Sequence, residues 1–245
     1  IKKKEQENQN KENSNFFEAH LLLMLDSIEN QDFEKSNKYM NKLLDTVNND
    51  TYKLLIFESL KKYNYLFQNK SILNEESSFD NFSNIIKAFE NCYIGNPNKT
   101  TSSFLNLINQ PDIDYSRYIF FYVNYLSKQE KFKRAEEVVS QVEELNSSLL
   151  IYQTKDWVKK KEFKNFDKIF SCQSELDILS EFFFLISNLY SSQQNFNKSN
   201  FYLNLSIFLN PKFKFNFSLM AENYYSEGDY ARSKRILNSF TPKDG

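Results

Sequence analysis

Glycine and proline are scarce in this sequence of 245 residues, which has three glycines and four prolines. A strand-rich fold needs such turn residues at short intervals, so their scarcity argues against one. The shortage of glycine also excludes a glycine-rich phosphate-binding loop. No run of roughly 18 apolar residues occurs, and the sequence therefore predicts no transmembrane helix.

Histidine and cysteine are nearly absent. The single histidine, His20, excludes a histidine-based metal cluster and argues against a histidine-dependent triad; we expect it in the core or between helices. Cys92 and Cys172 lie 80 residues apart, without metal-site spacing and in different predicted repeats. We expect two buried thiols and no disulfide. No catalytic constellation, metal site or cofactor site is predicted, so an enzyme is not expected.

The charge is balanced, with 31 basic and 32 acidic side chains and a net charge of −1. Such a balance gives no steering toward polyanions. Hydrophobic residues make up 40% of the chain, which is enough to build a core. The length allows one or two globular domains or one repeat array.

A pattern with a period of 34 residues runs from Glu181 to Phe240. Tyr190 and Tyr224 are equivalent positions in two copies, and so are Phe196 and Tyr230. A small residue, Ser199 or Ser233, stands three positions after Phe196 and after Tyr230. Two closely crossing helices leave room only for a small side chain at that point. Weaker copies occur earlier in the chain. The residues assigned to repeat packing are Phe33, Ser36, Phe132, Ala135, Phe163, Tyr190, Phe196, Ser199, Tyr224, Tyr230 and Ser233.

This period, with two amphipathic segments per unit, resembles the tetratricopeptide repeat (TPR), and the arrangement is similar to bacterial proteins of that family with no assigned function. The resemblance implies an all-α fold, an α-α superhelix. We expect a TPR-like solenoid of antiparallel helix pairs with about five to six repeats, irregular in the N-terminal half. At the eighth repeat position, where the family often has glycine or alanine, the last repeat has Ala221, and other repeats depart from the family with Ser187, Val123 and Met24.

The expected organisation has three parts. Residues 1–15 form a polar lead-in or an extension of the first helix, residues 16–110 form irregular TPR-like helices, and residues 111–245 form TPR repeats, the last two parts making one continuous solenoid. A short helix is predicted from Thr100 to Ile108 and capped by Thr100 or Thr101. Pro111 and Asp112 are expected to open the next helix.

In TPR arrays the first helix of each pair lines a concave groove, and the resemblance places specific side chains there. Phe120 occupies the place of a carboxylate-clamp lysine, which favours a generic peptide groove over a true clamp. The groove candidates are Arg117, Asn124, Lys128, Lys155, Lys159, Asn188, Glu222 and Tyr225.

We therefore expect a non-catalytic protein–protein interaction module, an adaptor or scaffold that binds a peptide or partner helix. Two alternatives stay open. Lysines between Lys155 and Lys168, with Trp157 and Phe163, suggest nucleic-acid binding, which the balanced charge opposes. Exposed solenoid ends suggest self-association into an oligomeric envelope scaffold. The expected location is cytoplasmic by default, or envelope or periplasm if a signal peptide was trimmed.

Overall fold

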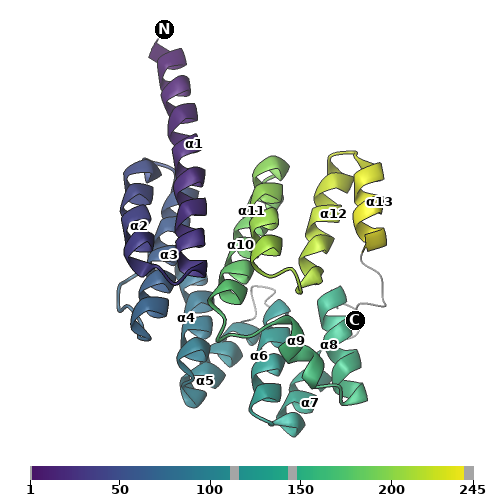
Figure 1. Cartoon of the computed structure of the whole chain (residues 1–245). Coiled ribbons are helices and arrows are strands. Elements are labelled where there is room, and N and C mark those ends of the chain that lie inside the picture. The colour runs from purple at the N-terminus through teal and green to yellow at the C-terminus, as the bar shows by residue number, and fades with distance from the viewer. Residues whose placement is uncertain (1, 111–115, 143–147, 240–245) are drawn as a thin grey trace. The chain divides into compact units, whose positions relative to one another are not determined.

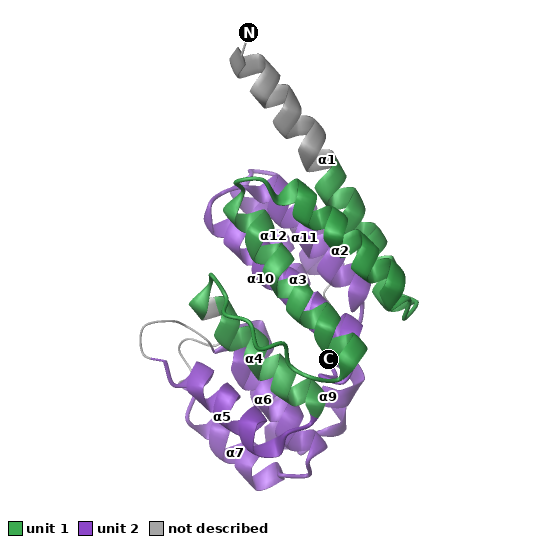
Figure 2. Ribbon diagram, turned by 90° about the vertical axis from the view of Figure 1, so that its left-hand side faces the viewer, with its two compact units in different colours: residues 1–94 green, residues 95–245 purple. Residues whose placement is uncertain are grey.

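The structure is a computed structural model that describes residues 2–110, 116–142 and 148–239, apart from the side chains of residues 2–15 and 81. The described residues form helices and no β-strand, which confirms the all-α prediction (Figure 1). The chain divides into two compact units, residues 1–94 and 95–245 (Figure 2). The predicted boundary at residue 110 groups α5 (Pro97–Ile108) with the first segment, whereas in the structure α5 packs on α6 (Arg117–Lys128).

The first unit contains α1 (Lys2–Glu29), α2 (Phe33–Val47), α3 (Thr51–Asn69) and α4 (Asp80–Ile94). Each helix packs on the next one along the chain. The backbone of the polar lead-in is helical, because α1 begins at Lys2. Apolar side chains at helical spacing form the core, including Phe17, Leu21, Leu43, Leu60 and Phe89.

The second unit begins with α5 and α6. It continues with α7 (Phe132–Ser140), α8 (Leu149–Lys160), α9 (Lys164–Ile169), α10 (Glu175–Ser192), α11 (Phe196–Leu209), the 3-10 helix η2 (Lys214–Asn216), α12 (Phe217–Ser226) and α13 (Tyr230–Ser239). The pairs α6–α7, α10–α11 and α12–α13 form helical hairpins, visible side by side in Figure 1. Helix α7 also packs on α8, and α11 on α12.

The predicted start of α5 is wrong. The helix begins at Pro97, and the side-chain oxygen of Asn96 accepts a hydrogen bond of 3.1 Å from the Lys99 amide. Proline fits the first turn of a helix and asparagine is a strong cap. Thr100 instead lies buried inside the helix. The predicted helix opening at Pro111 and Asp112 lies outside the described residues.

The same turn joins two helices at five places in the described chain. Its central residue has a left-handed backbone conformation in each case, with φ between +56° and +82°. The next amide donates to the carbonyl five residues earlier, over 2.8 to 2.9 Å, which satisfies a carbonyl at the end of the first helix. The left-handed residues are Gln31, Glu130, Lys161, Gln194 and Gly228.

The five turns lie at the aromatic positions that defined the sequence period. Phe33, Phe132, Phe163, Phe196 and Tyr230 each follow a left-handed residue by two positions. The small residues three positions later are buried, as the pattern predicts: Ser36, Ala135, Ser199 and Ser233. Among the aromatic packing residues, Phe163 and Tyr190 are buried, Phe33, Phe196 and Tyr224 are half-buried, and Phe132 and Tyr230 are exposed.

Pairs of serines pack α10 against α11, and one of them includes Ser187. The Ser187 hydroxyl donates to the Ser199 carbonyl over 2.9 Å, and the two hydroxyl oxygens are 2.9 Å apart. Ser180 and Ser206 form a reciprocal pair, in which each hydroxyl donates to the other residue's carbonyl over 2.7 Å. Serine is therefore accommodated between α10 and α11, because its small buried hydroxyl finds a partner on the facing helix.

Both cysteines are buried, as expected. Neither is a free thiol, however, and both are disulfide-bonded. The prediction of no disulfide is wrong, because spacing along a sequence does not decide whether a thiol is oxidised.

Candidate functional site

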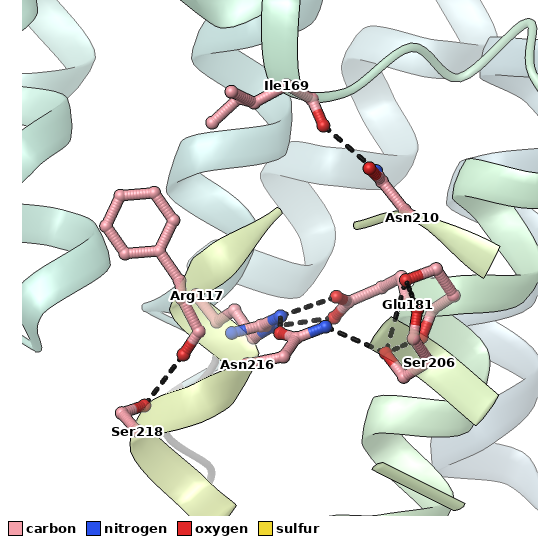
Figure 3. Close-up of polar contacts among 9 residues, drawn as sticks. Arg117, Ile169, Glu181, Ser206, Asn210, Asn216 and Ser218 are labelled. Atoms are coloured by element: carbon pink, nitrogen blue, oxygen red, sulfur yellow. Dashed lines mark hydrogen bonds and ion pairs between the residues drawn. The ribbon is translucent and has the colours of Figure 1, made fainter. Parts of the chain in front are cut away.

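Arg117, the first residue of α6, forms a two-pronged ion pair with Glu181 of α10 (Figure 3). Its Nε donates to Glu181 Oε1 over 2.8 Å and its Nη2 to Glu181 Oε2 over 2.7 Å. The Arg117 side chain is 18% exposed and that of Glu181 only 2%. Burial raises the pKa of Glu181, and the Arg117 guanidinium opposes that rise. This geometry is the strongest form of arginine–carboxylate contact.

The ion pair belongs to a longer polar network. Arg117 Nη2 also donates to Asn216 Oδ1 over 2.7 Å, and Asn216 Nδ2 donates to Ser206 Oγ over 2.8 Å. Asn210 Nδ2 donates to the Ile169 carbonyl over 2.9 Å (Figure 3). The segment after α11 is thereby tied to α6 and α9, and back onto α11 itself, by satisfied hydrogen bonds.

Aromatic rings surround the guanidinium. Its central carbon lies 3.6 Å from the ring centre of Phe184 and 5.3 Å from that of Phe213. Phe213 in turn packs on Phe120 and Phe121, with ring centres 5.3 and 5.9 Å apart. The first groove candidate is therefore occupied by internal partners, and Phe120 is a core residue.

The two other candidates on α6 also have partners within the fold. Asn124 is buried and donates to the Phe170 carbonyl over 3.1 Å. Lys128 is exposed, and its Nζ donates to Ser171 Oγ over 3.1 Å and to the side-chain oxygen of Gln173. Both residues connect α6 to the segment between α9 and α10.

The α8 candidates differ from each other. Lys155 is half-buried, and its ammonium group donates to the Val142 carbonyl over 2.9 Å. Lys159 is exposed and has no hydrogen-bond or ion-pair partner within the described ranges. It is therefore available to a ligand in a way that Arg117 and Asn124 are not.

The remaining candidates are three exposed residues on α10 and α12, which we call the tyrosine strip: Asn188, Glu222 and Tyr225. Asn188 and Glu222 are equivalent positions, 34 residues apart. A hydrogen bond of 2.6 Å from Ser191 Oγ to Asn223 Oδ1 joins the two helices beside them. Tyr225 is 64% exposed and its ring lies 5.1 Å from that of Tyr230. The strip offers an amide, a carboxylate and an exposed aromatic ring on two helices that this hydrogen bond connects.

A hollow that the sequence did not predict lies beside two of the repeat turns. It has a volume of about 750 Å³ and is lined by Phe132, Lys133 and Glu136 of α7, by residues 161–163 between α8 and α9, and by the first two residues of α9, Lys164 and Asn165. We call it the turn hollow. The Phe132 and Phe163 ring centres are 4.4 Å apart. The charged residues are visible in the sequence, but nothing in the period indicates that an open hollow lies beside the two turns.

Glu90 is a second feature that the sequence did not predict. It is buried in α4, and its Oε1 has no hydrogen-bond partner in the part of the chain that the structure describes. Burial raises its pKa to about 7, against the opposing charges of Lys62 and Lys87. A signal existed, because Glu90 lies at helical spacing from Ile86 and Tyr93 on an apolar face.

His20 belongs to α1, and its side chain lies at the contact of α1 with α2, as expected. Its ring is 6.2 Å from that of Phe16 and 6.4 Å from that of Tyr39. Burial lowers its pKa, and the nearby Lys42 charge acts in the same direction. Packing explains these contacts without a ligand.

The described residues contain no group of three histidine, cysteine or acidic side chains that could hold a metal ion. Within those residues no helix combines the length and apolar character needed to cross a membrane.

Comparisons with protein-family models, with curated proteins and with solved structures found no match.

Proposed function

We propose that this chain is a TPR-like array of stacked helix hairpins and acts as a non-catalytic module that binds a peptide or a partner helix. The five repeated turns carry this proposal, because the same left-handed residue, amide-to-carbonyl bond and following aromatic residue recur at each. Hairpins of one kind, stacked in sequence, bury a continuous core and present their first helices as an extended binding surface.

The tyrosine strip is the part of that surface best suited to a peptide. Asn188 and Glu222 are exposed and have no polar partner among the described residues, so their side chains can bond to a peptide backbone. Tyr225 adds an exposed ring with a hydroxyl, a side chain enriched at protein interfaces. Arg117 and Asn124 support the framework behind this surface rather than the contact itself.

Selection of a displayed random-peptide library on the intact chain tests the proposal. We expect selected peptides to lose about tenfold or more in affinity for Tyr225→Ala and for Asn188→Ala. Phe208→Ala is the matched control, because Phe208 is a 70% exposed aromatic residue on α11, a second helix of a hairpin. Peptides that bind all three variants equally well, or a library that yields no specific peptide, would contradict the proposal.

A further inference from the structure

The turn hollow combines an apolar wall with positive charge. Phe132 forms part of the wall and is 39% exposed, although its ring packs on Phe163. An exposed ring in a hollow of about 750 Å³ leaves room for a second large apolar side chain. The apolar part of a ligand would therefore sit against Phe132.

The lysines around the hollow have their charge available to a ligand. Lys133, Lys161 and Lys164 line it, and Lys131 precedes Phe132 in the adjoining turn. None of the four has a side-chain hydrogen bond or an ion pair within the described residues. Their neighbours differ, because Lys160 pairs with Asp156 at 2.8 Å and Arg134 with Glu137 at 2.7 Å.

Two carboxylates reduce the positive charge of the hollow but do not cancel it. Glu136 and Glu162 line the same hollow, and Glu162 Oε2 already accepts a hydrogen bond of 3.1 Å from Asn165 Nδ2. The lining lysines, with Lys131 in the adjoining turn, thus outnumber the lining glutamates. A ligand with several negative charges gains charge-assisted hydrogen bonds there, provided that it can keep its charges away from the two glutamates.

We propose that the turn hollow is a second interaction site, which binds an acidic peptide segment that carries one large apolar side chain. The apolar side chain packs on Phe132, and the peptide carboxylates pair with Lys133, Lys161 and Lys164. The site lies beside the turns and does not depend on the tyrosine strip.

A peptide fits the hollow better than a nucleic acid. Trp157 and Phe163, which the sequence offered as base-stacking residues, are 4% and 8% exposed and so cannot stack on a base. The evenly spaced phosphates of a nucleic acid would also meet the lining glutamates, whereas a peptide can place its acidic residues selectively.

Fluorescence anisotropy tests the site with a labelled peptide of one phenylalanine flanked by aspartates. We expect saturable binding to the intact chain that weakens about tenfold or more when salt rises from about 50 to about 200 mM. The double variant Lys161→Glu with Lys164→Glu, and separately Phe132→Ala, should each weaken binding by about tenfold. The charge-matched control is Lys38→Glu with Lys234→Glu, two exposed lysines elsewhere, which should bind normally.

Tyr225→Ala should leave this binding unchanged, so the result is independent of the proposal for the tyrosine strip. Equal weakening by the hollow and control double variants would overturn the inference, as would equal affinity for a peptide with alanine in place of phenylalanine. Absence of saturable binding would overturn it as well. Tighter binding of a single-stranded oligonucleotide that the hollow variants abolish would assign the site to nucleic acid instead.

Discussion

Arg117 and Glu181 join α6 to α10 through two parallel hydrogen bonds of 2.8 and 2.7 Å, although 64 residues separate them in the chain. The contact fixes two helices that are not neighbours in the hairpin order, and it does so through charges that are largely withdrawn from water. It is therefore sensitive to the loss of either partner.

Arg117→Ala should destabilise the second unit by about 3–5 kcal/mol, because it leaves the buried Glu181 carboxylate without its counter-charge. The double variant Arg117→Met with Glu181→Leu should recover most of that loss, since two apolar side chains remove both charges. Urea unfolding followed by circular dichroism measures the difference. A double variant as unstable as the single one would show that the ion pair is not the source of the loss.

Much of the fold was predictable because the repeat signal is local. The aromatic residues Phe33 and Phe196 mark copies of the sequence period, and in the structure each follows a turn whose hydrogen bonds span only a few residues. The pairing of Arg117 with Glu181 and the insertion of Phe213 among the α6 rings depend on distant parts of the chain. A repeat period carries no information about contacts between distant parts of the chain. The sequence therefore could not predict which of the groove candidates have partners inside the fold and which are exposed. Their role as a peptide site stays a prediction.

Glu90 makes stability depend on pH. Its folded-state pKa of about 7 lies above the ordinary value of 4.5. Below pH 4.5 the carboxyl is protonated in both states, and Glu90 costs the folded protein no stability. Stability is lost as the pH rises through 7, because the carboxyl ionises more readily in the unfolded chain, where water solvates its charge. Glu90→Gln should therefore raise the free energy of unfolding at about pH 8 by on the order of 2–3 kcal/mol, with little change at about pH 4.5.

Unfolding curves at several pH values give this difference directly. Glu76→Gln serves as the control, because Glu76 is an exposed glutamate in the loop between α3 and α4. A stability gain for Glu90→Gln that does not change between acidic and alkaline pH would show that ionisation of Glu90 is not responsible.

The Ser187–Ser199 contact allows a test of how tightly α10 and α11 pack. Both side chains are fully buried, and their hydroxyl oxygens are 2.9 Å apart. Ser187→Ala should cost only about 1 kcal/mol, because Ser199 keeps a hydrogen bond of 2.7 Å from Asn223 Nδ2. Ser187→Val should cost about 1–3 kcal/mol through overpacking. Thermal unfolding separates the two, and equal stability of both variants would contradict close packing at this position.

Phe213 gives the sharpest test of the segment that follows α11. Its buried ring contacts Phe120, Phe121 and Phe170, and it lies beside the Arg117 guanidinium. Phe213→Ala should therefore cost about 3–5 kcal/mol, because it opens a cavity among these rings. Phe213→Met should cost less than about 1.5 kcal/mol, since methionine refills most of the space.

The control for this pair is Phe208→Ala, which removes the same kind of side chain from a position in α11 that is 70% exposed. An exposed substitution away from such contacts should change the free energy of unfolding by no more than about 0.5 kcal/mol. Urea unfolding of the three variants measures the contrast between the buried and the exposed ring. If Phe213→Ala were as stable as Phe208→Ala, the ring of Phe213 would contribute nothing to the packing of α6, and the segment after α11 would then be held there by the polar contact of Arg117 with Asn216.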